Sequence, residues 1–201
     1  IATEYPDLSI IEIDHPATQE WKREALGRLD LQFKNIHFLS LDLLQDTMQQ
    51  VLLRSTHYDR KKPSVFVAEG LLMYLTEKEI AEILDFIKDD SGPGSRFIFT
   101  YMEESTEGDY QFRNVSWITS AWLRMKREVF TWGLRSDQLA LFLGRSGFQL
   151  LEFKTHKNLR EEFVAGGNRG EPLAIGENIA VAVEPSPPTP STTNGGVHGS
   201  R

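Results

Sequence analysis

Short apolar runs alternate with helix-like stretches along most of this chain, and this alternation limits the possible folds more than any other feature. The run from Leu8 to Ile13 is rich in β-branched residues and is followed by Asp14, His15 and Pro16. Residues 17–28 then carry apolar side chains at helical spacing. Strands that alternate with helices predict an α/β fold with a largely parallel sheet.

The rest of the chain continues the same pattern. The other predicted strands are 35–41, 65–68, 95–102, 148–155 and 177–184. The other predicted helices are 48–54, 77–88, 117–125 and 137–145. Thr76 and Glu79 predict a capping box at the start of the helix 77–88. Because the last two strands have no long helix between them, we expect them to form an antiparallel pair around the loop 158–176.

The composition excludes several classes of partner. The 22 Lys and Arg residues face 29 Asp and Glu residues, and the net charge of -7 argues against nucleic acid and anionic membrane surfaces. The chain has no cysteine, so disulfides and thiolate chemistry are excluded. Its apolar runs are shorter than a membrane helix of about 20 residues. We therefore expect a soluble, cytoplasmic domain over residues 1–184, followed by a disordered tail at 185–201 that is rich in Pro, Ser, Thr and Gly.

An acidic residue follows each of the first three predicted strands. These residues are Asp14, Asp42 and Glu69. Ligands of parallel α/β sheets bind outside the carboxyl ends of the strands, and a carboxylate there can accept hydrogen bonds from both hydroxyls of a ribose. Gly70 lacks a Cβ, so a ligand can approach its backbone closely. Asp14 has an alternative role, which is to cap the helix that follows Pro16.

Four segments resemble the leucine carboxyl methyltransferase family, in particular its bacterial S-adenosylmethionine-dependent O-methyltransferases. They are IIEIDHPATQEWKREAL at 10–26, SLDLLQD at 40–46, AEGLLMYLTEKEI at 68–80 and GSRFIFTYME at 94–103. The resemblance extends over about residues 10–183. It implies a class I methyltransferase fold, which is a Rossmann-like, seven-stranded sheet with helices on both faces and an antiparallel last strand.

The resemblance also implies roles for individual residues. Asp14 would hold the ribose hydroxyls of S-adenosylmethionine, Asp42 and the backbone of Leu43 would contact the adenine, and Glu69 would line the methionine end beside Gly70. Tyr74 and Tyr101 would lie on the side of the methyl acceptor, which is a small molecule or a protein carboxylate.

The chain departs from the family at its front. Family members carry a first strand with a glycine-rich loop before the strand that ends at Asp14, whereas Ile1 to Asp7 contains neither glycine nor arginine. We therefore expect the first strand to be missing. That strand lies between the Asp14 and Glu69 strands in this fold, so these two strands either close up on each other or leave an open slot.

The expected chemistry is transfer of a methyl group from a sulfonium to an oxygen. A carboxylate acceptor needs no general base, whereas a hydroxyl acceptor needs one, and Tyr101, Glu103 and His156 are the candidates. His15, His37 and His57 lack metal-ligand spacing, so no metal is expected.

Three further alternatives remain open. The aromatic residues Trp117, Trp122, Phe130 and Trp132 suit a substrate pocket, although core packing is the more common role of such a stripe. Tyr58 and Lys62 have the Tyr-x-x-x-Lys spacing of nicotinamide-dependent short-chain dehydrogenases, but they precede Pro63 in a polar loop. The third alternative is a non-catalytic remnant of a methyltransferase domain.

Overall fold

The computed structural model describes residues 1–29, 33–42, 45–105, 108–110, 112, 130–164 and 175–185. Its strands are β1 (Ile10–Asp14), β2 (Ile36–Ser40), β3 (Val65–Ala68), β4 (Arg96–Met102), β5 (Gln149–Lys154) and β6 (Glu177–Val183). Its α-helices are α1 (Pro16–Arg28), α2 (Met48–Arg54), α3 (Glu77–Asp90), α5 (Leu139–Arg145) and α6 (His156–Phe163). Short 3-10 helices occupy η1 (Leu72–Tyr74) and η2 (Ser136–Gln138).

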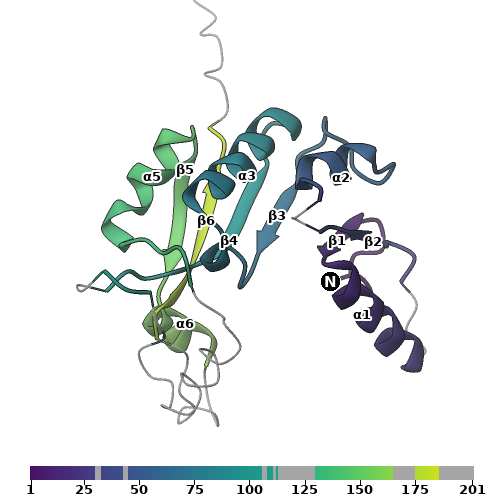
Figure 1. The fold of residues 1–201 in the computed structure, drawn as a ribbon, viewed down its shortest axis with the longest axis horizontal. Coiled ribbons are helices and arrows are strands. Elements are labelled where there is room, and N and C mark those ends of the chain that lie inside the picture. The colour runs from purple at the N-terminus through teal and green to yellow at the C-terminus, as the bar shows by residue number, and fades with distance from the viewer. Residues whose placement is uncertain are drawn as a thin grey trace, which may run out of the picture.

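The strands form two sheets (Figure 1). β1 and β2 pair in parallel, with Asp14 opposite Ser40. The second sheet has the order β3-β4-β6-β5, in which β3 and β4 are parallel and β6 is antiparallel to both β4 and β5. This arrangement confirms the α/β class, the antiparallel last strand and the antiparallel pairing of the two late strands.

The sheet is interrupted between β1 and β3. In the described part of the chain β1 pairs only with β2, and β3 pairs only with β4, so the edges of β1 and β3 lack a strand partner. Val65 and Val67 on β3 are 62% and 67% exposed, although valine in a strand is usually half buried. Of the two expected outcomes, the open slot is the one observed.

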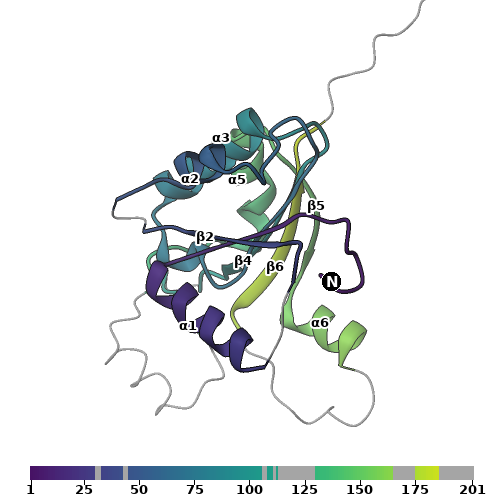
Figure 2. The same ribbon diagram turned by 90° about the vertical axis from the view of Figure 1, so that its right-hand side faces the viewer.

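The hydrophobic core lies under α3 and α5, which pack against one face of the larger sheet (Figure 2). Phe97, Phe99 and Tyr101 alternate along β4 and point into this core. The opposite face carries Ile98 and Val181, which are only half buried. Trp132 is buried beside Phe142, which confirms the core role of this aromatic residue.

Helix ends follow local sequence signals. Thr76 and Glu79 form the predicted capping box of α3, and Gly147 has a φ of 83° just beyond α5. Thr47 and Gln50 form a second capping box at α2. The expectation of a plain loop over 158–176 is wrong, because α6 begins at His156 with Thr155 as its N-cap. Trp117 and Trp122 and the tail 186–201 lie outside the described residues.

In α1 the fully buried side chain is polar, and the apolar positions are exposed or half buried. Trp21 is 70% exposed and Leu29 is 68% exposed, whereas Gln19 is 1% exposed. The helix packs on β1 and β2 through polar side chains, and helical spacing alone does not reveal this. No described helix is long and apolar enough to cross a membrane.

A stacked histidine pair joins β2 to the loop after α2. The ring centroids of His37 and His57 are 3.5 Å apart with an interplanar angle of 5°. Burial, together with electrostatic repulsion from His57, lowers the pKa of His37. The unfolded chain, with a histidine pKa of about 6.5, therefore binds more protons than the folded protein just below that pH.

We expect the stability of the protein to fall as the pH drops from 7 to 5, and His37→Gln to weaken this dependence. The physical reason is that protonation of His37 places a charge against His57 and is disfavoured in the folded state. Urea unfolding of the wild type and the variant across this range measures the effect. An unchanged pH slope in the variant would contradict the prediction.

Candidate functional site

The predicted cofactor residues follow the carboxyl ends of parallel strands, as the sequence indicates. Asp14 is the last residue of β1, and the N–H of Leu41 donates to its backbone carbonyl at 2.9 Å. Asp42 follows two residues after β2, and Glu69 follows β3 directly. All three acids therefore lie at or just beyond the carboxyl end of a strand, and none lies inside a helix.

The carboxylate of Asp14 has two partners. The backbone N–H of His15 donates to Oδ1 at 2.7 Å, and the Nζ of Lys22 donates to Oδ2 at 2.7 Å. The N-cap of α1 is His15, whose side chain accepts from the N–H of Ala17. The alternative that Asp14 caps this helix is therefore wrong.

A polar cluster beneath α1 surrounds Asp14. Lys22 also contacts Oε1 of Glu12, which lies on the same face of β1 two residues before Asp14. The amide of Gln19 donates to Oε2 of Glu12 at 2.7 Å and to the carbonyl of Leu39 at 2.9 Å. The hydroxyl of Ser40 donates to Gln19 at 2.9 Å, so the cluster ties α1 to both strands.

The ionisation of Asp14 follows from these contacts. Burial alone raises its pKa, but the hydrogen bonds from Lys22 and His15 outweigh burial, and the net pKa lies below the ordinary value. The bonds to Asp14 and Glu12 raise the pKa of Lys22 in turn. The pair is therefore charged at neutral pH.

The loop after β2 is held by Asp42. Its carboxylate accepts a hydrogen bond from the side chain of Gln45 at 2.7 Å, and its carbonyl accepts from the N–H groups of Gln45 and Asp46. Leu43, the predicted adenine contact, lies outside the described residues. The proposed adenine site therefore has one described member.

The turn after β3 combines an exposed acid with a backbone position that favours glycine. Glu69 is exposed, and Gly70 has a φ of 61°, in the left-handed region. The Gly70 N–H donates to Oγ1 of Thr100 at 2.8 Å, which joins this turn to β4. A Cβ at Gly70 would meet no atom within 4 Å, so the space above it is open.

The segment 130–138 crosses the carboxyl ends of β3 and β4. The N–H of Thr131 donates to the carbonyl of Met73 at 2.8 Å, and the N–H of Leu134 donates to the carbonyl of Met102 at 2.9 Å. Phe130 thereby lies edge-on to Tyr74, with ring centroids 5.5 Å apart. Tyr74 remains 43% exposed, so this predicted substrate residue is accessible.

Tyr101 and Glu103, the predicted catalytic residues, join one hydrogen-bonded cluster. The hydroxyls of Tyr101 and Ser136 are 2.9 Å apart, and Ser136 donates to Glu103 through both its hydroxyl and its backbone N–H. The buried side chain of Asn178 also donates to Glu103. The sequence offered no signal for Ser136 and Asn178, because they come from distant segments.

The environment of Tyr101 differs from that of a general base. Its side chain is fully buried, and burial raises its pKa, so the phenol is protonated at neutral pH. Glu103 is half buried, and its carboxylate accepts hydrogen bonds from Ser136 and Asn178. The catalytic assignment of both residues stays a prediction, with Glu103 the more accessible of the two.

The dehydrogenase-like pair is not assembled. The hydroxyl of Tyr58 donates to the carbonyl of Asp90 at 2.5 Å, and burial together with the charge of Asp90 raises its pKa to about 12. Lys62 instead lies 4.0 Å from the carboxylate of Asp59. A catalytic tyrosine needs a lowered pKa, so the spacing of Tyr58 and Lys62 is accidental.

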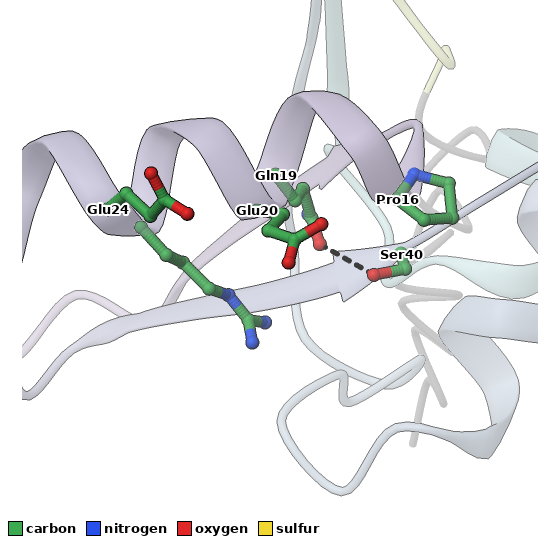
Figure 3. A pocket seen from close by; sticks show the side chains of 6 residues that line it. Pro16, Gln19, Glu20, Glu24 and Ser40 are labelled. Atoms are coloured by element: carbon green, nitrogen blue, oxygen red, sulfur yellow. Dashed lines mark hydrogen bonds between the residues drawn. The ribbon is translucent and has the colours of Figure 1, made fainter.

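One shallow pocket of about 380 Å³ lies between α1 and the end of β2 (Figure 3). It is lined by Pro16, Gln19, Glu20, Arg23, Glu24 and Ser40. None of the predicted cofactor residues lines it, so it is not part of the site. The described residues contain no group of three or more His, Cys, Asp or Glu side chains that could hold a metal ion.

Comparisons with known proteins show which family and which fold this chain resembles. Residues 2–88 match the family described as Leucine carboxyl methyltransferase. A protein of Mycolicibacterium paratuberculosis, assigned as an S-adenosyl-L-methionine-dependent methyltransferase, is 30% identical over 129 residues, which are 64% of this chain and 42% of the relative. A protein of Mycobacteroides abscessus with the same assignment is 24% identical over 165 residues, covering 72% of this chain and 54% of the relative.

A solved structure shares the fold. The crystal structure of a protein assigned as a methyltransferase, from Thermobifida fusca, matches with a TM-score of 0.55 and 16% identity, and the match covers 90% of this chain and 65% of that chain. This likeness shows the class I methyltransferase fold. The chain spans less than two thirds of each of these three proteins.

Proposed function

We propose that this chain is part of an S-adenosylmethionine-dependent methyltransferase of the leucine carboxyl methyltransferase family, whose model its residues 2–88 match. The observation that carries the proposal is the ionised carboxylate of Asp14 at the carboxyl end of β1. Ligands of parallel α/β sheets bind outside the carboxyl ends of the strands. The proposed cofactor site consists of Asp14, Asp42, Leu43, Glu69 and Gly70.

The described residues fit this cofactor. A carboxylate offers about four lone-pair positions, and Asp14 uses two of them for His15 and Lys22, which leaves two for ribose hydroxyls. The exposed carboxylate of Glu69 supplies negative charge for the cationic methionine end, and the open space at Gly70 admits it. S-adenosylmethionine, when bound, supplies an activated methyl group on a sulfonium.

We assign the methyl acceptor as an oxygen, either a carboxylate or a hydroxyl. Tyr74 is the exposed residue of the proposed acceptor side, and Phe130 holds its ring in place. For a hydroxyl acceptor the proposed base is Glu103, whose carboxylate is fixed by Ser136 and Asn178. Tyr101 is protonated and holds the hydroxyl of Ser136, so it supports this carboxylate.

Asp14→Ala is expected to weaken the binding of S-adenosylhomocysteine about 10- to 100-fold. Hydrogen bonds to a charged group contribute about 1.5–3 kcal/mol, and the variant removes the acceptor of both ribose hydroxyls. Calorimetric titration into the folded protein measures the dissociation constant. Binding that the substitution leaves unchanged would contradict the assignment of Asp14.

Asp85→Ala is the matched control, because this carboxylate is exposed on α3, where it forms a salt bridge with Lys88. We expect it to bind S-adenosylhomocysteine as the wild type does. A folded wild-type protein that gives no heat would contradict cofactor binding itself and would favour the non-catalytic remnant.

A further inference from the structure

We infer that Lys22 is the positioning residue of the ribose site: it holds the Asp14 carboxylate in the orientation that receives a vicinal diol. This inference rests on the proposed function, and it concerns a side chain that cofactor contacts alone do not identify. Lys22 lies in the second turn of α1, eight residues after Asp14, and its Nζ is 2.7 Å from Oδ2 of Asp14.

The orientation follows from where the two donors attach. The N–H of His15 occupies one lone-pair position on Oδ1, and Lys22 occupies one on Oδ2. Each oxygen therefore keeps one further position. Two acceptor positions on two different oxygens match the two neighbouring hydroxyls of a ribose. With both oxygens anchored, the carboxylate cannot rotate freely.

The charges around Asp14 give Lys22 a second task. Glu12 and Asp14 point to the same face of β1, so their negative charges repel each other. The positive charge of Lys22 contacts both carboxylates and offsets their repulsion. Gln19 supplies only a neutral amide to Glu12. The lowered pKa of Asp14 is consistent with this neutralisation.

A merely structural role for Lys22 would make a different prediction. Gln19 already ties α1 to β1 and β2 through Glu12, Leu39 and Ser40. The helix therefore keeps an anchor when Lys22 is replaced. Asp14, in contrast, loses its contact to Lys22 and keeps the hydrogen bond from the His15 N–H.

The test is the dissociation constant of S-adenosylhomocysteine for the intact protein that contains this chain, measured by calorimetry from pH 7.5 to pH 5. We expect Lys22→Met to bind about tenfold more weakly at pH 7.5, as is typical when a residue that orients a ligating side chain is lost. The ratio of the variant's dissociation constant to that of the wild type should grow as the pH falls. Without Lys22, Asp14 beside Glu12 protonates more readily than it does in the wild type. His15 is present in both proteins and contributes equally to both.

Lys22→Arg should restore most of the affinity, because a guanidinium also donates to both carboxylates. Lys78→Met, which removes an exposed ion pair with Glu82 on α3, should bind as the wild type does. If Lys22→Met does not fold, Lys22→Gln replaces it, since it keeps a polar donor without the charge. Thermal unfolding of each variant separates a loss of stability from a loss of affinity.

The outcomes are distinct. A ratio near one at every pH for the folded Met or Gln variant would overturn the role of Lys22 while leaving cofactor binding intact. A lowered affinity with a ratio that does not change with pH would also overturn it, in favour of a packing role. No binding by the folded wild type would overturn the proposed function and this inference with it.

Discussion

Replacing Asp90 by alanine is expected to lower the free energy of unfolding by about 2 kcal/mol, because its buried carboxylate accepts from Gln49 and contacts the exposed Arg60, and hydrogen bonds to charged groups contribute about 1.5–3 kcal/mol. The side chain of Asp90 is 6% exposed at the end of α3. Its carboxylate contacts the guanidinium of Arg60 and accepts a hydrogen bond from Gln49 at 2.8 Å.

The effect is large because Asp90 joins three segments. Gln49 lies on α2, Arg60 lies in the loop before β3, and the hydroxyl of Tyr58 in the same loop donates to the Asp90 carbonyl. Tyr58 also packs against Phe66 and Phe86, so the loop is docked on the core. This docking sets the start of β3 and hence the place of Glu69.

Urea unfolding at pH 7 measures the loss. Asp90→Asn keeps the shape and one acceptor, so we expect about half the effect. Asp89→Ala is the matched control, because this neighbouring side chain is exposed, and it should change the stability by less than about 0.5 kcal/mol. Equal losses for Asp89→Ala and Asp90→Ala would show that helix-end charge, rather than the contacts of the buried Asp90 carboxylate, is responsible.

Gly92→Ala is expected to destabilise the protein by about 3 kcal/mol, at the upper end of the range for overpacking. A Cβ at this position would lie 2.3 Å from the carbonyl carbon of Lys62 and 2.6 Å from the carbonyl oxygen of Lys61. Both are backbone atoms and cannot rotate away. The N–H of Gly92 also donates to the Lys62 carbonyl at 3.0 Å, and a shift of the backbone would break this bond.

The midpoint of thermal unfolding measures this loss, and Gly144→Ala is the control. Gly144 lies inside α5, and its Cβ would meet no atom within 4 Å. Alanine is favoured over glycine in a helix by about 1 kcal/mol, so the control should be as stable as the wild type or more stable. A Gly92→Ala protein with a wild-type midpoint would mean that the approach of residues 61–62 to Gly92 is looser than the structure has it.

Local patterns predicted the elements and the strand-end acids. The capping box at Thr76 and Glu79 fixes the start of α3 within a few residues of sequence, and the apolar runs locate β1 and β4. The acids Asp14, Asp42 and Glu69 follow strands as expected. These features depend on neighbours along the chain, so the sequence contains all the information that they need.

These local patterns could not predict contacts between distant segments of the chain. The stripe at Trp21 has helical spacing, yet Gln19 is the buried residue of α1, because the strands beneath it present Glu12 and Ser40. The gap between β1 and β3 was inferred from the family resemblance, and no periodicity in the chain indicates it.

Local patterns in the chain define the α/β class, the order of the elements and the acids at the strand ends, because periodicity and capping depend on neighbouring residues. The contacts of Lys22 with Asp14, of Ser136 and Asn178 with Glu103, and of Gly92 with Lys62 are visible only in the folded protein. Each of these contacts depends on where separate segments meet in space. A side chain in one segment carries no local sign of the partner that folding brings to it.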